Sequence, residues 1–221
     1  MTDPLPVCII GAGLSGMTSA KHLLDRSIPF EWFEIGSSYG GNWRYDNDNG
    51  RSAAYASLQI DTSKDRFAFS DLPMPKAWPD YLPHTQFLEY LGQYMHAFEL
   101  GDHVRYRHEV TLVEPAGDGW MVTVHDLAND TMNAKLYRAV IVANGHHWAP
   151  NVPQTEGPFA GRIIHAQEYR SPEPYIGANV VVVGAGNTAV DIASELSWHA
   201  STVTVATRSG AYVLPRYVLG R

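Results

Sequence analysis

At residues 7–16 the chain reads VCIIGAGLSG, an apolar run that ends in three glycines with the spacing G-x-G-x-x-G. The apolar run, Val7 to Ile10, predicts a buried parallel strand, and Leu14 to Arg26 has apolar residues at helical spacing. A second predicted strand, Phe30 to Glu34, completes a βαβ unit. In such a unit the glycines allow a tight turn and let the backbone approach a pyrophosphate at the N-terminus of the helix. The stretch therefore predicts a dinucleotide-binding, Rossmann-like fold.

An acidic residue stands where this fold binds the ribose of the nucleotide. Glu34 ends the second predicted strand, and a carboxylate there accepts hydrogen bonds from a ribose 2′-hydroxyl. The same charge would repel a 2′-phosphate, so this site favours FAD or NAD. The candidate ligands from this unit are Gly11, Gly13, Ser15, Gly16 and Glu34.

The pattern recurs at residues 184–189, which read GAGNTA. Two predicted strands, Asn179–Val183 and Thr202–Ala206, flank a predicted helix, Thr188–Leu196. Arg208 follows the second strand in place of an acid, and a guanidinium pairs with a 2′-phosphate through charge-assisted hydrogen bonds. This second site therefore favours NADP(H). Its candidate ligands are Gly184, Gly186, Asn187, Thr188 and Arg208.

The chain between the two glycine motifs changes character several times. Residues 36–83 are irregular and rich in turn residues, and a connection of this length usually covers a ligand or serves a function. Thr85–Phe98 has the spacing of a helix. Val104–Tyr137 alternates apolar and polar residues, which predicts an antiparallel meander inserted into the parallel fold, and Ala139–Ala143 predicts another buried strand. The aromatic residues of the irregular segment either line a pocket or pack into the core; they are Trp43, Tyr45, Tyr55, Phe67, Phe69 and Trp78.

We expect two domains, at residues 1–155 and 156–221. The second has room for one βαβ unit, whereas a complete doubly wound domain has about six strands. The first lacks a C-terminal return of the chain. We therefore expect the chain, which stops at Arg221, to be a fragment of a longer protein.

Composition excludes several classes of protein. The formal net charge is −7 with no basic run, which argues against nucleic acid as a partner. Cys8 is the one cysteine, so the chain has no internal disulfide and we expect this thiol to be buried among apolar residues. The histidines are scattered, which argues against a metal site. Without a signal peptide or a membrane-length apolar stretch, we expect a cytoplasmic protein.

Residues 159–169 read FAGRIIHAQEY. This segment matches F-x-G-x-x-x-H-x-x-x-Y, and in it the chain resembles the flavin-containing monooxygenases. Residues 40–43 (GGNW) are similar to the family's G-G-x-W beside the flavin, residues 69–75 (FSDLPMP) to F-S-D-F-P-x-P, and residues 143–145 (ANG) to A-T-G. The related Baeyer–Villiger enzymes usually have tryptophan where this chain has Tyr169. The motif residues are Phe159, Gly161, His165 and Tyr169, and the resemblance adds Gly41, Trp43, Val110 and Ala143 to the FAD site.

The resemblance implies an α/β protein with a Rossmann-like FAD-binding domain that carries a β-meander insertion, followed by the start of a Rossmann-like NADP-binding domain. It implies that NADPH reduces FAD and that O2 then gives a C4a-hydroperoxyflavin. This species would oxygenate a small-molecule nucleophile at sulfur or nitrogen. His165 would link the domains or position a cofactor instead of transferring a proton. A homodimer is left open.

One position departs from the family pattern. Residues 57–64 read SLQIDTSK where the family has S-L-x-x-N-x-x-K, so Asp61 replaces an asparagine near the reactive edge of the flavin. An amide donates and accepts hydrogen bonds, whereas an ionised carboxylate only accepts them. We take Asp61 as the candidate catalytic position. Two alternatives follow: an uncoupled NADPH oxidase that releases H2O2, or a fragment that binds nucleotide without turnover. A disulfide reductase would need a redox-active cysteine pair that Cys8 alone does not supply.

Overall fold

The computed structural model describes residues 4–153, 156–210, 212 and 217. The chain divides into two compact units, Met1–Glu168 and Tyr169–Arg221. The sequence predicts a domain boundary after residue 155. Residues 154 and 155 lie outside the described ranges, and so does Arg221. Residues up to Glu168 stay with the first unit, and the side chain of Gln167 donates a hydrogen bond of 3.2 Å to the carbonyl oxygen of Trp148.

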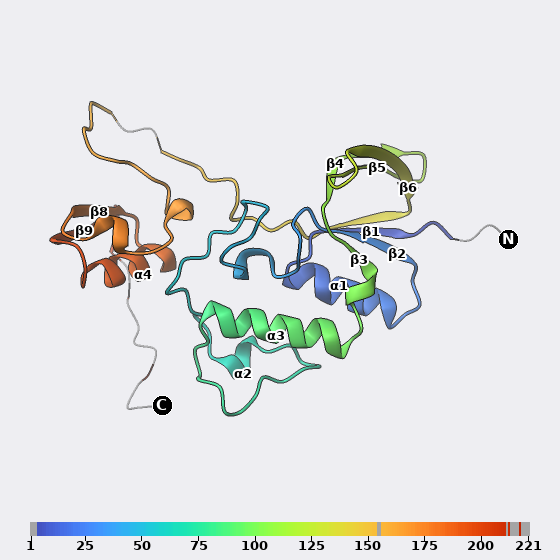
Figure 1. Ribbon diagram of the computed structural model, residues 1–221, viewed down its shortest axis with the longest axis horizontal. Helices are drawn as coiled ribbons and strands as arrows, with labels where there is room; N and C mark the ends of the chain where they lie inside the picture. The colour runs from blue at the N-terminus through green and yellow to red at the C-terminus, as the bar shows by residue number, and fades with distance from the viewer. Residues whose placement is uncertain (1–3, 154–155, 211, 213–216, 218–221) are drawn as a thin grey trace. The chain divides into compact units, whose positions relative to one another are not determined.

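The first unit is built on a parallel sheet with the strand order β3-β2-β1-β7 (Figure 1). The strands are β1 (Val7–Ile10), β2 (Phe30–Phe33), β3 (Val104–Arg105) and β7 (Ala139–Val142). The expected βαβ unit is confirmed, and so is the strand that starts at Ala139. The prediction for Val104 is wrong, since Val104 pairs in parallel with Trp32 and is not part of the meander. A strand of two residues is too short to show whether apolar and polar residues alternate along it.

Helices cover one face of this sheet. They are α1 (Leu14–Leu24) and α3 (His84–Ala97), both of which lie below the sheet in Figure 1. Successive residues of a strand point to opposite faces, so Ile9 and Trp32 face the helices and pack with Met17 and Phe87. The long irregular segment adds a 3-10 turn (Gly41–Trp43) and α2 (Lys64–Phe67) to this side. Four of its aromatic residues pack against this core: Trp43, Phe67, Phe69 and Trp78. Trp43 also lines a pocket, so the core-packing alternative is confirmed for Phe67, Phe69 and Trp78.

The antiparallel meander covers the other face, as Figure 1 shows above β1 and β2. Its strands are β4 (His108–Ala116), β5 (Gly119–Asp126) and β6 (Thr131–Tyr137), in that order. Cys8 and Phe33 pack here against Val122, Val124 and Tyr137. Cys8 is fully buried as expected, and burial together with the nearby charge of Glu31 raises the pKa of its thiol to about 12.

The second unit is one βαβ motif. It consists of β8 (Asn179–Val183), α4 (Asn187–Leu196) and β9 (Thr202–Ala206), with the two strands parallel. All three predicted elements are confirmed, and Ile192 and Leu196 bury the inner side of the helix. No helix among the described residues of either unit is long and apolar enough to cross a membrane.

Candidate functional site

The glycine turn after β1 is closed tightly by its neighbours. Gly11 has φ +99°, and a Cβ there would lie 2.5 Å from the carbonyl oxygen of Ala143. A Cβ on Gly16 would lie 1.9 Å from the carbonyl oxygen of Gly11. The indole N–H of Trp32 donates to that same oxygen at 2.8 Å. Glycine at residues 11 and 16 therefore lets α1 start directly against the sheet, as its motif requires.

A second glycine turn lies against the first. The N–H of Gly40 donates to the carbonyl oxygen of Ala12 at 2.9 Å, and a Cβ on Gly41 would lie 3.1 Å from the Cα of Gly13. Gly13 is also the N-cap of α1 and brings no side chain to cap it. The first N–H groups of α1 thus point out of a bare backbone surface, which is an arrangement that favours anions.

Glu34 joins the end of β2 to this surface. Its side chain is buried, with 5% exposed. One carboxylate oxygen accepts a hydrogen bond from the N–H of Ala12 at 2.7 Å. The other accepts from the N–H of Gly36 at 2.8 Å and from the side chain of Asn49 at 3.3 Å. Hydrogen bonds to an ionised acceptor are strong, so Glu34 is fixed in place beside the turn.

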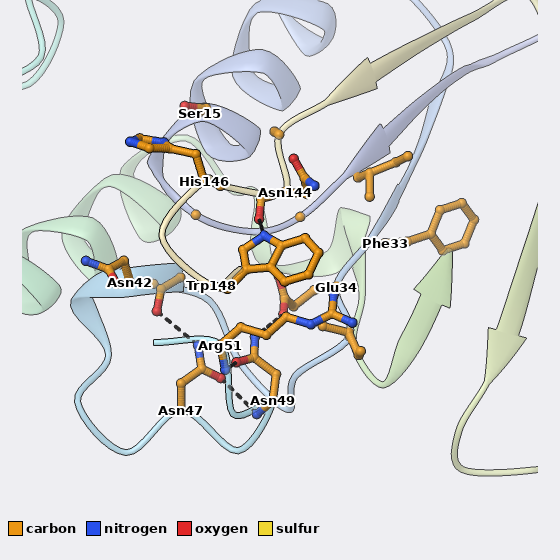
Figure 2. Close-up of a pocket in the computed structure, with 18 of the residues that line it drawn as sticks. Ser15, Phe33, Glu34, Asn42, Asn47, Asn49, Arg51, Asn144, His146 and Trp148 are labelled. Carbon is orange, nitrogen blue, oxygen red and sulfur yellow. Dashed lines mark hydrogen bonds between the residues drawn. The ribbon is translucent and has the colours of Figure 1, made fainter. Parts of the chain in front are cut away.

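These features share one pocket of about 540 Å³ in the first unit (Figure 2). Its wall contains eight of the nine residues expected at the FAD site, namely Gly11, Gly13, Ser15, Glu34, Gly41, Trp43, Val110 and Ala143. The ninth, Gly16, packs behind the turn. Sequence reasoning missed several apolar residues and glycines of this wall, and also these polar residues and one tryptophan: Asn42, Asn47, Asn49, Arg51, His108, Glu109, Asn144, His146, His147 and Trp148. The available signal was the density of asparagine at residues 42–49.

The asparagines hold the loop that forms this wall. The side chain of Asn47 donates to the carbonyl oxygen of Gly41 at 2.9 Å. The side-chain oxygen of Asn42 accepts from the N–H of Ala53 at 2.8 Å. Both bonds tie the loop to itself, so this wall of the pocket is shaped in advance by the chain's own contacts.

Asp61 lies outside the wall of this pocket. Its side chain is exposed. The segment around it is fixed by backbone bonds of Ile60 to Leu82 and of Lys64 to Asp80. The ammonium of Lys64 is buried and donates to the carbonyl oxygens of Lys76 and Trp78. The catalytic role of Asp61 stays a prediction.

The segment FSDLPMP at residues 69–75 ties two helices together. Lys21 of α1 forms an ion pair of 3.0 Å with Asp71, and hydrogen bonds to Asp25 and Asp71 raise the pKa of Lys21 to about 12. Tyr90 of α3 donates to the carbonyl oxygen of Leu72 at 2.6 Å. The role of this segment in the first unit is therefore to hold α1 and α3 together.

The second glycine motif repeats the local geometry of the first. Gly184 has φ +122°, and Gly186 is the N-cap of α4, which begins at Asn187 and Thr188. Arg208 follows β9 with an exposed side chain. A shallow apolar hollow in this unit is lined by residues such as Ala185, Val190 and Thr207, and none of the five expected ligands lines it.

Each motif residue of the FAGRIIHAQEY segment makes a contact of its own. A Cβ on Gly161 would lie 2.5 Å from the ring of Phe159, so glycine leaves room for that ring. The Nδ1 atom of His165 accepts from the N–H of Gln167 at 3.1 Å. The last motif residue, Tyr169, is buried and donates to the carboxylate of Glu195 on α4 at 2.6 Å. The motif thus ends by attaching the chain to the helix of the second unit.

A parallel sheet, a glycine turn at a helix N-terminus and a buried acid at the end of the next strand define a Rossmann-like nucleotide-binding protein. The chain belongs to the family described as flavin-binding monooxygenase-like, whose model matches residues 5–219. It is 37% identical to dimethylaniline monooxygenase [N-oxide-forming] 2 of Rattus norvegicus over 221 residues, which cover 95% of this chain and 41% of the rat protein. The chain therefore spans less than half the length of that relative.

Solved structures share the fold of this chain. S-allyl-L-cysteine S-oxygenase from Allium sativum superposes with a TM-score of 0.85 at 28% identity, over 98% of this chain and 54% of that one. Tmm from Pelagibacter sp. strain HTCC7211 superposes with a TM-score of 0.86 at 26% identity, over 93% of this chain and 51% of that one. The expected family and the Rossmann-like α/β fold are confirmed.

Proposed function

We propose that this chain carries the FAD site and part of the NADPH site of a monooxygenase that transfers one oxygen atom from O2 to a sulfur or nitrogen centre of a small molecule. Membership of the flavin-binding monooxygenase-like family supports the reaction class. The choice of nucleophile is supported by the names of two relatives, one N-oxide-forming and one an S-oxygenase. Both names describe those proteins, and the proposal extends them to this chain.

The observation that carries the proposal is the meeting of three features in one pocket: the glycine turn at the N-terminus of α1, the buried Glu34, and the turn at Gly40–Trp43. The backbones of Gly13 and Gly41 pack closely together in the wall of this pocket. A diphosphate at this wall would meet the N–H groups at the N-terminus of α1. A carboxylate held beside that turn suits ribose hydroxyls. The residues present therefore fit FAD.

Each part of the chain has a distinct task in this proposal. Bound FAD would supply the redox chemistry that passes electrons from NADPH to O2. The N-terminus of α1 would hold the diphosphate, and Glu34 the ribose. Trp43 packs with its ring centroid 4.5 Å from that of Phe87 and 5.8 Å from that of Phe67, so these two rings support the wall at the G-G-x-W turn. In the second unit, the N-terminus of α4 and Arg208 would receive NADPH.

The test is spectroscopic. The purified protein, supplied with FAD, should retain a flavin absorption band through gel filtration. NADPH without oxygen should bleach that band, and air should restore it with formation of an S-oxide or N-oxide from a thioether or tertiary amine. A protein that stays colourless after incubation with FAD contradicts the proposal.

Arg208 offers a sharper test of the NADPH assignment. Arg208→Gln should raise the KM for NADPH by about tenfold, the value of one charge-assisted contact, and leave the KM for NADH unchanged. Arg26→Gln, at an exposed position just after α1, is the matched control. Equal effects on NADPH and NADH would refute a role for Arg208 at a 2′-phosphate.

A further inference from the structure

Trp148 and Arg51 form a stacked pair in the wall of the pocket, next to Glu34 (Figure 2). The guanidinium carbon of Arg51 lies 4.7 Å from the centroid of the Trp148 ring, which is within cation–π range. The indole N–H donates to the carbonyl oxygen of Asn144 at 3.1 Å. The backbone of Trp148 is held as well, through the side chain of Gln167 at 3.2 Å. The indole ring therefore has a fixed orientation.

The pair presents an aromatic surface and not a free charge. The guanidinium of Arg51 forms an ion pair of 2.9 Å with Glu109, and the backbone N–H of Arg51 donates to the side-chain oxygen of Asn49 at 2.8 Å. Since Glu109 balances the guanidinium, the group that Trp148 and Arg51 offer to a ligand is the flat indole ring. Such a ring suits another flat ring.

The covalent structure of a dinucleotide indicates which ring of the ligand would lie against Trp148. The base is attached to the ribose on the side away from the phosphates. With the diphosphate at the N-terminus of α1 and the ribose at Glu34, the base extends into the part of the wall formed by Asn49, Arg51, Val110 and Trp148. We propose that Trp148, held by Arg51, stacks on the adenine of FAD and makes the pocket select the adenine dinucleotide over FMN. This inference rests on the proposed FAD site.

Calorimetric titration of the flavin-free protein with FAD, ADP and FMN tests the inference, with saturating NADP+ present to fill the second site. ADP carries the base, ribose and diphosphate without flavin, whereas FMN carries flavin without the base. Stacking of one base on an aromatic side chain corresponds to about tenfold in affinity. We expect Trp148→Ala to weaken FAD and ADP binding by about this same factor and to leave FMN binding unchanged, while Trp148→Phe retains most of the affinity.

Two further variants keep the result interpretable. Trp198→Ala removes an indole that is 85% exposed in the second unit and should change none of the three affinities. If Trp148→Ala fails to fold, Trp148→Leu removes the aromatic face with a smaller change in volume, and the same loss is expected. Thermal midpoints are compared for every variant.

Each outcome decides something. A loss confined to FAD, with ADP unchanged, or no loss for any ligand, overturns the stacking role. Failure of the wild-type protein to bind FAD, with ADP bound in a Trp148-dependent way, refutes the proposed flavoprotein and keeps the adenine site. Failure to bind either ligand refutes both.

Discussion

The N–H of Ala12 donates a hydrogen bond of 2.7 Å to the carboxylate of Glu34, across 22 residues of sequence. This bond connects the turn after β1 with the end of β2, and residues of both segments line the pocket. Glu34 therefore has a structural task before any ligand arrives: it organises the turn that we propose to hold a diphosphate.

Glu34→Gln should destabilise the flavin-free protein. Both carboxylate oxygens of Glu34 accept from backbone N–H groups, of Ala12 and of Gly36, so either orientation of a glutamine amide sets its NH2 against a donor. The expected loss in the free energy of unfolding is about 1–3 kcal/mol, measured by urea titration. Glu114→Gln, on the exposed side of β4, is the control. Equal unfolding midpoints for both variants would contradict the task we assign to Glu34.

Gly16→Ala should be poorly tolerated. The new Cβ would sit 1.9 Å from the backbone oxygen of Gly11, so helix or strand must shift. We expect a loss of about 3 kcal/mol or more in the free energy of unfolding and loss of bound flavin on gel filtration. Gly101→Ala, where a Cβ meets no atom within 4 Å, should be neutral. A Gly16→Ala protein that is stable and retains yellow flavin would show that the turn can move away from residue 16 at little cost in free energy.

Ionisation of Glu31 should make the free energy of unfolding depend on pH. Burial alone would raise the pKa of Glu31, but hydrogen bonds from Lys135 and Tyr137 and the charge of Arg105 outweigh it and hold the pKa below its ordinary value. A lowered pKa in the folded state gives stability that is present above the unfolded pKa of about 4.3 and is lost as pH falls through the folded pKa.

Glu31→Gln should therefore be less stable than the wild type from pH 7 down to about pH 5, and the gap should close at lower pH. Urea unfolding at a series of pH values measures this difference. A gap that persists unchanged to pH 2 would mean that packing, and not ionisation of Glu31, is responsible.

Tyr169→Phe should weaken the attachment of the family motif to α4. Burial and the hydrogen bond to Glu195 raise the pKa of Tyr169, so the hydroxyl remains a donor through neutral pH. Removal of the hydroxyl should lower the free energy of unfolding of this region by about 1–3 kcal/mol. The loss should be detected as faster hydrogen exchange in α4. Tyr212→Phe, at a fully exposed ring, should leave the exchange rates as they are.

Asp61→Asn tests the departure from the family pattern and is measured with a thioether or tertiary amine as substrate. An amide restores a hydrogen-bond donor at this position. We expect a larger fraction of the NADPH consumed to appear as oxygenated product and a smaller fraction as H2O2. Unchanged coupling would contradict a catalytic role, in keeping with the exposed side chain.

The elements around the glycine motifs could be predicted because their signals are local. The run at Val7–Ile10 and the glycines after it determine a strand and a turn within a few residues of each other, and the structure ends β1 at Ile10 as expected. Val104 could not be placed, because its partner Trp32 is distant in sequence and the strand has two residues. Short-range periodicity carries no information about such a pairing.

Only part of the pocket wall could be predicted from the sequence. Glu34 and Val110 followed from the nucleotide-binding pattern and from the family resemblance. Trp148 did not, because its position depends on contacts with Arg51 and Gln167 that come from separate parts of the chain. A tryptophan after a strand gives no sign of what it will stack on until those segments are folded together.

The single cysteine has a practical consequence. Cys8 lies in β1, an inner strand of the parallel sheet, and is fully buried with a raised pKa. A thiol reagent therefore reaches it only when β1 separates from the meander that covers it. Without any engineered label, the rate of alkylation of the native protein therefore reports how often the nucleotide-binding sheet opens, and slower alkylation after addition of FAD would measure the coupling between ligand and sheet in a single reaction.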